Sequence, residues 1–184
     1  MGNKLRLFFA YPLADKEKLY FSEQSSKYFE YFDGKWVNKN NYHITVKFLG
    51  EVPDFLVEKI MNSFEQNLKF LKPTTMNVDR CGFFGKPLPK VLWFGSSFVS
   101  DEMIGNFYTV QESLNKFNFR KENYYMPHIT ICRIKKVKKD LEGSYKIKNL
   151  KVAINSIVLY KSTLTRHGSE YEKLKEWKIK EVKI

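Results

Sequence analysis

The chain has 184 residues, 43% of them hydrophobic and 16% aromatic, so it can bury a real core and is not a disordered chain. Its net charge of +12 favours an anionic partner, but only five of the 32 basic residues are arginine, and an excess of lysine by itself specifies no partner. No apolar run approaches the ~18 residues that cross a bilayer, no signal peptide is visible, and two cysteines are too few for a disulfide framework, so we expect a cytoplasmic protein that does not enter a membrane.

The predicted elements mix strands with helices along the whole chain. A strand over 5–10 leads into a helix over 13–32, which ends at a turn made by Asp33 and Gly34. A strand rich in β-branched residues covers 43–49, and a helix with Asp54 as its N-cap follows. The remaining predictions are a helix from 101 towards 117 and strands over 74–83, 91–94, 128–134, 152–161 and 171–182. This mixture indicates an α+β fold.

A weak internal repeat accompanies these elements. A helix followed by a strand that begins His-Ile-Thr occurs twice, and the two histidines, His43 and His128, are 85 residues apart. That period is too long for a solenoid repeat. We therefore expect residues 1–184 to form a single domain of two similar lobes that face each other across a cleft, with one triplet contributed by each lobe.

Each triplet presents one imidazole and one hydroxyl on the same face of its strand. Residues i and i+2 of a strand share a face, so His43 stands beside Thr45 and His128 beside Thr130, while the intervening isoleucines point into a core. Histidine has an unperturbed pKa of about 6.5, which lets one imidazole accept a proton while the other donates one. The threonine hydroxyls suit the non-bridging oxygens of a phosphate. The four groups predict phosphodiester chemistry that demands no metal.

Other interpretations of the same residues are weaker. A single His-x-Thr on a strand is usually a half-buried histidine with a hydrogen-bonded neighbour, and it is the repetition of the triplet that favours a paired site. A zinc site lacks a third histidine, an HExxH motif and a nearby cysteine pair. Strict alternation puts Cys132 on the face of His128, but roughly 13 Å away, too far for a nucleophile pair. His167 precedes a glycine and is expected to be only a turn residue.

The duplicated His-x-Thr resembles the signature of the 2H phosphoesterase superfamily, and its surroundings resemble the RNA 2′,3′-cyclic phosphodiesterase branch, also called 2′-5′ RNA ligase. The segments that carry the resemblance are 5–10, 41–50, 91–95 and 126–133, with Ser162 and 168–171 resembling a closing hairpin. The resemblance implies a bilobal α+β fold, in which two pseudo-symmetric lobes of antiparallel sheet carry their helices outside and enclose a central groove.

The resemblance also implies a function. Such an enzyme opens RNA 2′,3′-cyclic phosphate ends to 2′-phosphates, can run 2′-5′ ligation, uses no cofactor or metal, and is expected to act as a monomer. By the same resemblance His43 protonates the leaving 3′-oxygen, His128 activates water, and Thr45 and Thr130 hold the phosphate. The alternatives are a phosphodiesterase for small cyclic nucleotides or 2′-5′ oligonucleotides, and an RNA-binding module that does not catalyse.

The same resemblance draws attention to three further residues. Arg133 falls where the family often has an arginine near the substrate, and Phe48 where an aromatic ring can stack on a base. Each lies five residues after its histidine, so strict alternation points both away from the groove unless a bulge intervenes. Lys47 replaces a residue that is more often small or apolar in the family, and we expect it to contact phosphate or to sit at the rim.

Overall fold

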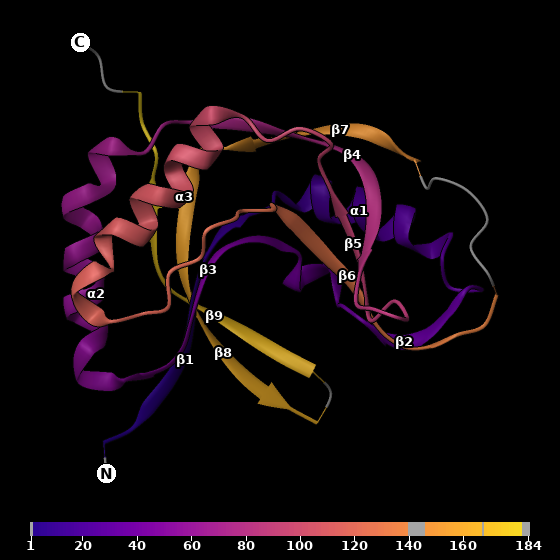
Figure 1. Ribbon diagram of the computed structural model, residues 1–184, viewed down its shortest axis with the longest axis horizontal. Helices are drawn as coiled ribbons and strands as arrows, with labels where there is room; N and C mark the ends of the chain where they lie inside the picture. Colours follow the sequence, from indigo (N-terminus) through magenta and orange to yellow (C-terminus); the bar gives the residue numbers. More distant parts are fainter. Residues whose placement is uncertain (1, 140–145, 167, 182–184) are drawn as a thin grey trace.

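The computed structural model describes residues 2–139, 146–166 and 168–181 and gives the course of the chain in Figure 1. Among these residues the helices are α1 (Asp15–Ser26), α2 (Asp54–Asn67) and α3 (Asp101–Ser113), with 3-10 turns at Lys39–Asn41, Leu68–Phe70 and Asn115–Phe117. The strands are β1 (Lys4–Pro12), β2 (Phe32–Trp36), β3 (His43–Pro53), β4 (Thr74–Phe84), β5 (Val91–Gly95), β6 (His128–Val137), β7 (Lys146–Ile154), β8 (Ser156–Thr165) and β9 (Gly168–Lys178). His167 lies outside the described residues.

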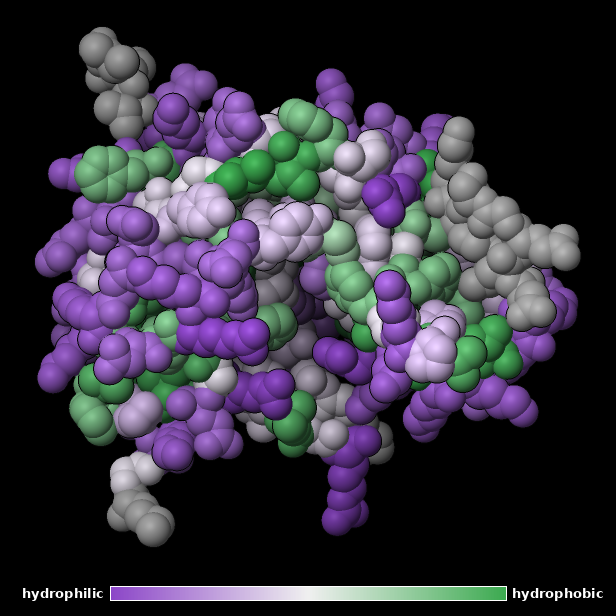
Figure 2. Space-filling view, viewed as in Figure 1, coloured by the Kyte–Doolittle hydropathy of each residue, from purple (hydrophilic) through white to green (hydrophobic). Residues whose placement is uncertain are grey.

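The strands form one antiparallel sheet whose order is β7-β4-β5-β6-β3-β1-β8-β9, with β2 paired to β6. The sheet divides at the contact between β3 and β6, where the described ladder consists of the pair Ile44 and Ile129. β3, β1, β8 and β9 make the first lobe, and β7, β4, β5, β6 and β2 make the second. Because the strands diverge from one pair, the sheet opens like a V, and the space-filling surface is hollowed between the lobes (Figures 1 and 2).

Helices cover the outer face of each lobe. Phe64 of α2 packs on Phe9 of β1 with 4.8 Å between ring centroids, and α3 lies against α2 on the same lobe (Figure 1). Phe21 of α1 packs on Phe94 of β5 in the second lobe, at 6.1 Å. Both central isoleucines of the triplets are fully buried, as the alternation predicts. The predicted α+β fold with two lobes and external helices is therefore confirmed.

The predicted helix over 13–32 is wrong beyond residue 26. The α-helix ends at Ser26, and residues 32–36 form β2, which pairs with β6. Ser25 and Ser26 each donate a hydroxyl hydrogen bond to the carbonyl three residues back, which competes with helix continuation. Gly34 lies inside this strand and not in a turn. A Cβ there would come within 2.5 Å of the Arg133 carbonyl oxygen, so the close approach of β6 requires glycine.

The predicted strand over 152–161 is two strands in two lobes. β7 ends at Ile154 on β4, and β8 begins at Ser156, from where it runs beside β1. Asn155 alone separates them, so the chain crosses between the lobes over one residue. The β-branched and apolar residues before Asn155 and after Ser156 make the two strands look like one in the sequence.

Smaller differences concern element ends. Pro53, not Asp54, is the N-cap of α2, and α3 gives way to a 3-10 turn at Asn115. The last strand begins and ends earlier than predicted, at Gly168–Lys178, and forms with β8 the hairpin that the resemblance implies. Within the described residues no helix is long and apolar enough to cross a membrane.

Candidate active site

The two His-Ile-Thr triplets lie side by side at the seam between the lobes. Since Ile44 pairs with Ile129 on antiparallel strands, His43 lies towards Thr130, and Thr45 lies towards His128. All four side chains project from the face opposite the buried isoleucines, which is the hollowed face. The two histidines therefore occupy diagonal positions, which in a regular ladder are roughly 7–8 Å apart and admit a phosphate between them.

The same hydrogen bond orients both imidazoles. His43 Nδ1 lies 2.7 Å from the Asn41 carbonyl oxygen, and His128 Nδ1 lies 2.8 Å from that of Met126, in each case two residues upstream. A carbonyl only accepts, so each Nδ1 carries a proton and each neutral imidazole keeps its lone pair on Nε2. The Thr45 hydroxyl donates to His43 Nε2 at 3.0 Å. Both reactive nitrogens are thus fixed in one tautomer and directed by the chain itself.

Burial lowers the pKa of both histidines. The pKa of His43 falls to about 4, first because burial disfavours the imidazolium and also because the charge of His128 repels it, against the carbonyl of Asn41. Burial likewise lowers the pKa of His128, opposed by the Met126 carbonyl. The repulsion agrees with the nearness of the two histidines across the Ile44 and Ile129 pair, and with both pKa values lowered the imidazoles are neutral at neutral pH when the groove holds no anion.

Aromatic rings form the wall behind each imidazole. His43 packs against Phe8 of β1 at 5.0 Å and edge-on to Tyr171 of β9 at 5.2 Å. His128 packs edge-on to Phe84 of β4 at 4.9 Å and lies 6.3 Å from Trp93 of β5. Each histidine thus rests on a phenylalanine from another strand of its own lobe. These rings exclude water from the imidazoles, which is the physical cause of their lowered pKa.

A β-bulge occurs at the same place after each triplet. In β3 the pairing with β1 steps from Thr45 to Lys47, and in β6 the pairing with β5 steps from Thr130 to Cys132. The extra residue, Val46 or Ile131, lies three positions after its histidine and inverts the alternation beyond it.

The bulges bring Phe48 and Arg133 to the face of the histidines. Phe48 pairs with Phe8, and the two rings are 5.7 Å apart, so Phe48 extends the aromatic wall beside His43 with 56% of its surface exposed. Arg133 is exposed and pairs with Val91, on the face that Trp93 shares with Thr130. Strict alternation would have turned both away from the groove.

Comparison with known proteins identifies this arrangement. Residues 22–93 and 99–171 match the family described as "LigT like Phosphoesterase". The chain belongs to the LigT-like phosphoesterase family. An RNA 2′,3′-cyclic phosphodiesterase of Methanocaldococcus jannaschii is 34% identical over 183 residues, which cover 94% of this chain and 100% of the relative. One from Thermotoga maritima is 29% identical over 181 residues, covering 94% of each chain.

Solved structures agree on the LigT-like fold. The protein TT0787 of Thermus thermophilus superposes with a TM-score of 0.83 at 18% identity, covering 95% of this chain and 98% of that one. E. coli LigT complexed with 3′-AMP gives 0.81 at 22% identity, with 97% and 100% covered. At these identities the likeness concerns the fold alone. Together with the family match, it confirms the resemblance to the 2H superfamily that the two triplets indicated.

Strict alternation placed Lys47 and Cys132 on the face of the histidines, but both side chains lie on the opposite face. Lys47 points away from the groove into the interior and is 3% exposed, because the bulge at Val46 places it on the face of Phe9. Cys132 is fully buried and faces away from His128 for the same reason. Burial raises the pKa of its thiol to about 11, which suits a packing residue.

The sequence did not indicate the residues that support the histidines. Phe8, Phe84 and Tyr171 come from strands whose neighbours are set by the tertiary fold, so no local pattern marks them. The carbonyls that bind the two Nδ1 atoms are local in sequence, since Asn41 and Met126 each precede their histidine by two residues.

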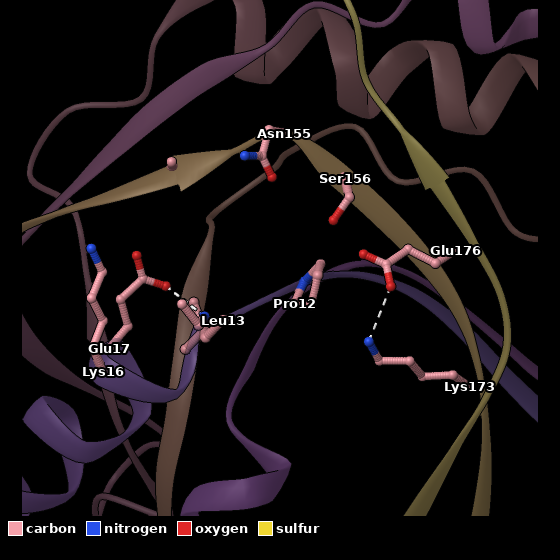
Figure 3. Close-up of a pocket in the computed structure, with 10 residues that line it drawn as sticks. Pro12, Leu13, Lys16, Glu17, Asn155, Ser156, Lys173 and Glu176 are labelled. Carbon is pink, nitrogen blue, oxygen red and sulfur yellow. Dashed lines mark hydrogen bonds and ion pairs between the residues drawn. The ribbon is translucent and has the colours of Figure 1, made fainter.

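A separate pocket of about 350 Å³ lies where β1 ends and β7 passes to β8 (Figure 3). It is lined by Pro12, Leu13, Ala14, Lys16, Glu17, Ala153, Asn155, Ser156, Lys173 and Glu176. Glu17 accepts the Ala14 amide at 2.8 Å, and Lys173 pairs with Glu176 at 3.1 Å. Neither histidine lines it, so we assign it no part in the chemistry. Over the part of the chain that is described, no group of three or more His, Cys, Asp or Glu side chains is arranged to hold a metal ion.

Proposed function

We propose that this chain is an RNA 2′,3′-cyclic phosphodiesterase that produces 2′-phosphate ends by acid-base catalysis between His43 and His128. The observation that carries the proposal is the matched pair of imidazoles, each tied through Nδ1 to a carbonyl two residues upstream, which leaves Nε2 as the nitrogen that exchanges a proton. The M. jannaschii and T. maritima relatives with this name support the substrate class.

The reaction divides the proton transfers between the two histidines. His128 accepts a proton from a water molecule whose oxygen attacks phosphorus, the bond from phosphorus to O3′ breaks, and His43 gives its Nε2 proton to O3′. The product carries a 2′-phosphate and a free 3′-hydroxyl. Protonated His43 Nε2 no longer accepts from the Thr45 hydroxyl, so Thr45 and Thr130 can both donate hydrogen bonds to the non-bridging oxygens, where charge accumulates in the transition state. With a 5′-hydroxyl oxygen in place of water's, the same steps open the cyclic phosphate to a 2′-5′ linkage and a free 3′-hydroxyl, and their reverse cleaves that linkage.

His43 must be protonated before it acts as the acid. With a pKa of about 4 it is neutral in the unliganded protein at neutral pH. The negative phosphate between the imidazoles favours the imidazolium, so substrate binding itself raises the pKa of the acid. Arg133 adds a positive charge for the same phosphate, and Phe48 offers its exposed ring to the terminal base. No step requires a metal ion.

The test is hydrolysis of an RNA oligomer with a terminal cyclic phosphate in excess EDTA, followed by mapping of the product. We expect a 2′-phosphate, and a rate lowered at least ~10²-fold by His43→Ala or His128→Ala. Full activity in either variant, or a 3′-phosphate product, would overturn the acid-base assignment.

The two roles are separated by a substrate whose bridging O3′ is replaced by sulfur, because a thiolate leaves without protonation. We expect this substrate to restore much of the rate of His43→Ala and none of the rate of His128→Ala. The opposite pattern would exchange the acid and the base. We also propose the cytoplasm as the compartment, since both cysteines are free and buried. A monomeric state stays a prediction.

A further inference from the structure

The chain reaches the second triplet through a segment without helix or strand. Residues 118–127 lead from the 3-10 turn after α3, on the first lobe, to His128 at the start of β6 in the second lobe. The segment contains Met126, whose carbonyl orients His128. The described ladder between the lobes is the single pair Ile44 and Ile129. The position of residues 118–127 therefore depends on contacts outside the sheet.

Lys47 supplies the first of these contacts, from β3 just beyond Thr45. Its side chain is 3% exposed, and its Nζ donates to the Arg120 carbonyl and, at 3.4 Å, to Gln111 Oε1. Nζ also lies 3.4 Å from the Glu122 carboxylate, which is 42% exposed. A residue next to the first triplet thus holds the backbone that leads to the second.

Gln111 of α3 fixes the same backbone from the other side. Its Oε1 accepts the Glu122 amide at 2.7 Å, and its Nε2 donates to the Glu122 carbonyl at 2.8 Å. Three residues on, the Tyr125 hydroxyl donates to the Thr45 carbonyl at 3.3 Å, and its ring stacks on Phe107 at 4.6 Å. We call Lys47, Gln111 and the backbone of 120–122 the latch.

The energetics argue that the latch is more than packing. Burying an ammonium group costs several kcal/mol before its partners compensate, and an apolar side chain of similar length would fill the same space at lower cost. What the lysine adds is a polar contact, because its ammonium donates to the Arg120 carbonyl and an apolar side chain would leave that carbonyl without this donor.

We propose that Lys47 is a positioning residue, which through the latch sets the place of the Met126 carbonyl and therefore the orientation of His128 against His43. The catalytic part of this inference rests on the proposed function. Displacement of a catalytic group by about 1 Å can lower a rate by ~10²-fold, so a small movement of the latch is sufficient to matter.

The test compares Lys47→Met with Gln111→Met, which break the latch from opposite sides. We expect each to lower kcat on cyclic-phosphate RNA by roughly 10- to 100-fold while KM changes less than about 3-fold, because binding survives and alignment does not. In proton NMR spectra we expect the hydrogen-bonded Nδ1 proton of His128 to exchange rapidly in both variants, while that of His43 stays protected. A general loss of stability would expose both protons, and either variant suffices if the other does not fold.

One control isolates the latch. Lys4→Met removes an exposed lysine, paired with Glu51 at 3.8 Å, from the same pair of strands. It should keep kcat within about 2-fold of wild type, as exposed ion pairs contribute little.

Unchanged kcat and a protected His128 proton in the folded Lys47→Met and Gln111→Met variants would overturn the proposal. If the wild-type chain lacked cyclic phosphodiesterase activity, the proposed function would fail, while the NMR comparison would still decide whether the latch orients His128.

Discussion

At the scale of single residues, two imidazoles are kept neutral in a place that, under the proposed function, receives the negative charge of a phosphate. Aromatic rings do this by excluding water, and the carbonyls of Asn41 and Met126 partly oppose it by favouring the protonated ring. The pKa of His43 falls to about 4, and repulsion by His128 adds to the effect of burial. The free site therefore avoids holding two positive charges.

The shifted pKa of His43 makes folding stability depend on pH. Between its ordinary 6.5 and about 4, the unfolded chain binds a proton at this residue and the folded chain does not. The free energy of unfolding must therefore fall as pH drops through this window, by about 3 kcal/mol at most from this group, with the loss complete below pH 4.

Urea unfolding at pH 7 and pH 4.5 measures the effect. We expect wild type to lose more stability over this interval than His43→Gln, whose remaining loss reports His128 and the carboxylates. Equal losses in the two proteins would mean that the His43 imidazole is not buried as described. Added phosphate should protect the wild type at the acid end, because the anion stabilises the imidazolium.

At the scale of elements, strand alternation explains most of what the sequence predicted and the bulges explain what it did not. The placement of His43, Thr45, His128 and Thr130 needs only a period of two, which is local. The positions of Phe48, Arg133 and Lys47 depend on one extra residue in each strand, and nothing in Val46 or Ile131 marks it. A bulge depends on how a strand pairs with its neighbour, which the sequence of that strand alone does not reveal. Phe8 and Phe84 likewise reach the histidines from other strands, through the tertiary fold.

The second lobe depends on a close fit over Gly82 of β4. A Cβ at this position would lie 2.3 Å from Trp93 Cζ2, so the indole ring, which also carries the Arg80 guanidinium 5.3 Å from its centroid, covers the glycine directly. We expect Gly82→Ala to displace the ring and to destabilise the fold by about 1–3 kcal/mol. Since Trp93 lies beside His128, kcat should fall as well.

Gly105→Ala is the matched control for that prediction. Gly105 is exposed within α3, and a Cβ there meets nothing within 4 Å, so alanine should stabilise the helix by about 0.5–1 kcal/mol. Thermal unfolding measures whether Gly82→Ala lowers and Gly105→Ala raises the stability of the protein. A neutral Gly82→Ala would show that the indole has room to move.

At the scale of the whole molecule, the two triplets meet at the contact between the lobes, and the chain passes between the lobes repeatedly. It leaves β1 for α1 and β2 in the second lobe, returns for β3 and α2, and crosses again to β4 and β5 (Figure 1). The proposed function therefore needs both lobes, because His43 lies on β3 and His128 on β6. The repeat with 85 residues between the histidines indicated two similar lobes, but it did not indicate that the chain alternates between them.

The net charge of +12 is a property of the whole surface, and its meaning can be measured through salt. If the groove binds only the terminal cyclic phosphate, kcat/KM for an RNA oligomer and for a 2′,3′-cyclic mononucleotide should decline equally with salt concentration. If upstream phosphates also contact lysine and arginine side chains, the oligomer should decline more steeply, by a slope of about 0.7 in log–log form for each additional phosphate bound. We expect the steeper decline, because a polyanion is attracted by the net positive charge of the protein. Parallel slopes would favour a small cyclic nucleotide as substrate and would assign the lysine excess to solvated surface, whereas a slope that disappears in Arg133→Gln would place the extra phosphate beside that one arginine.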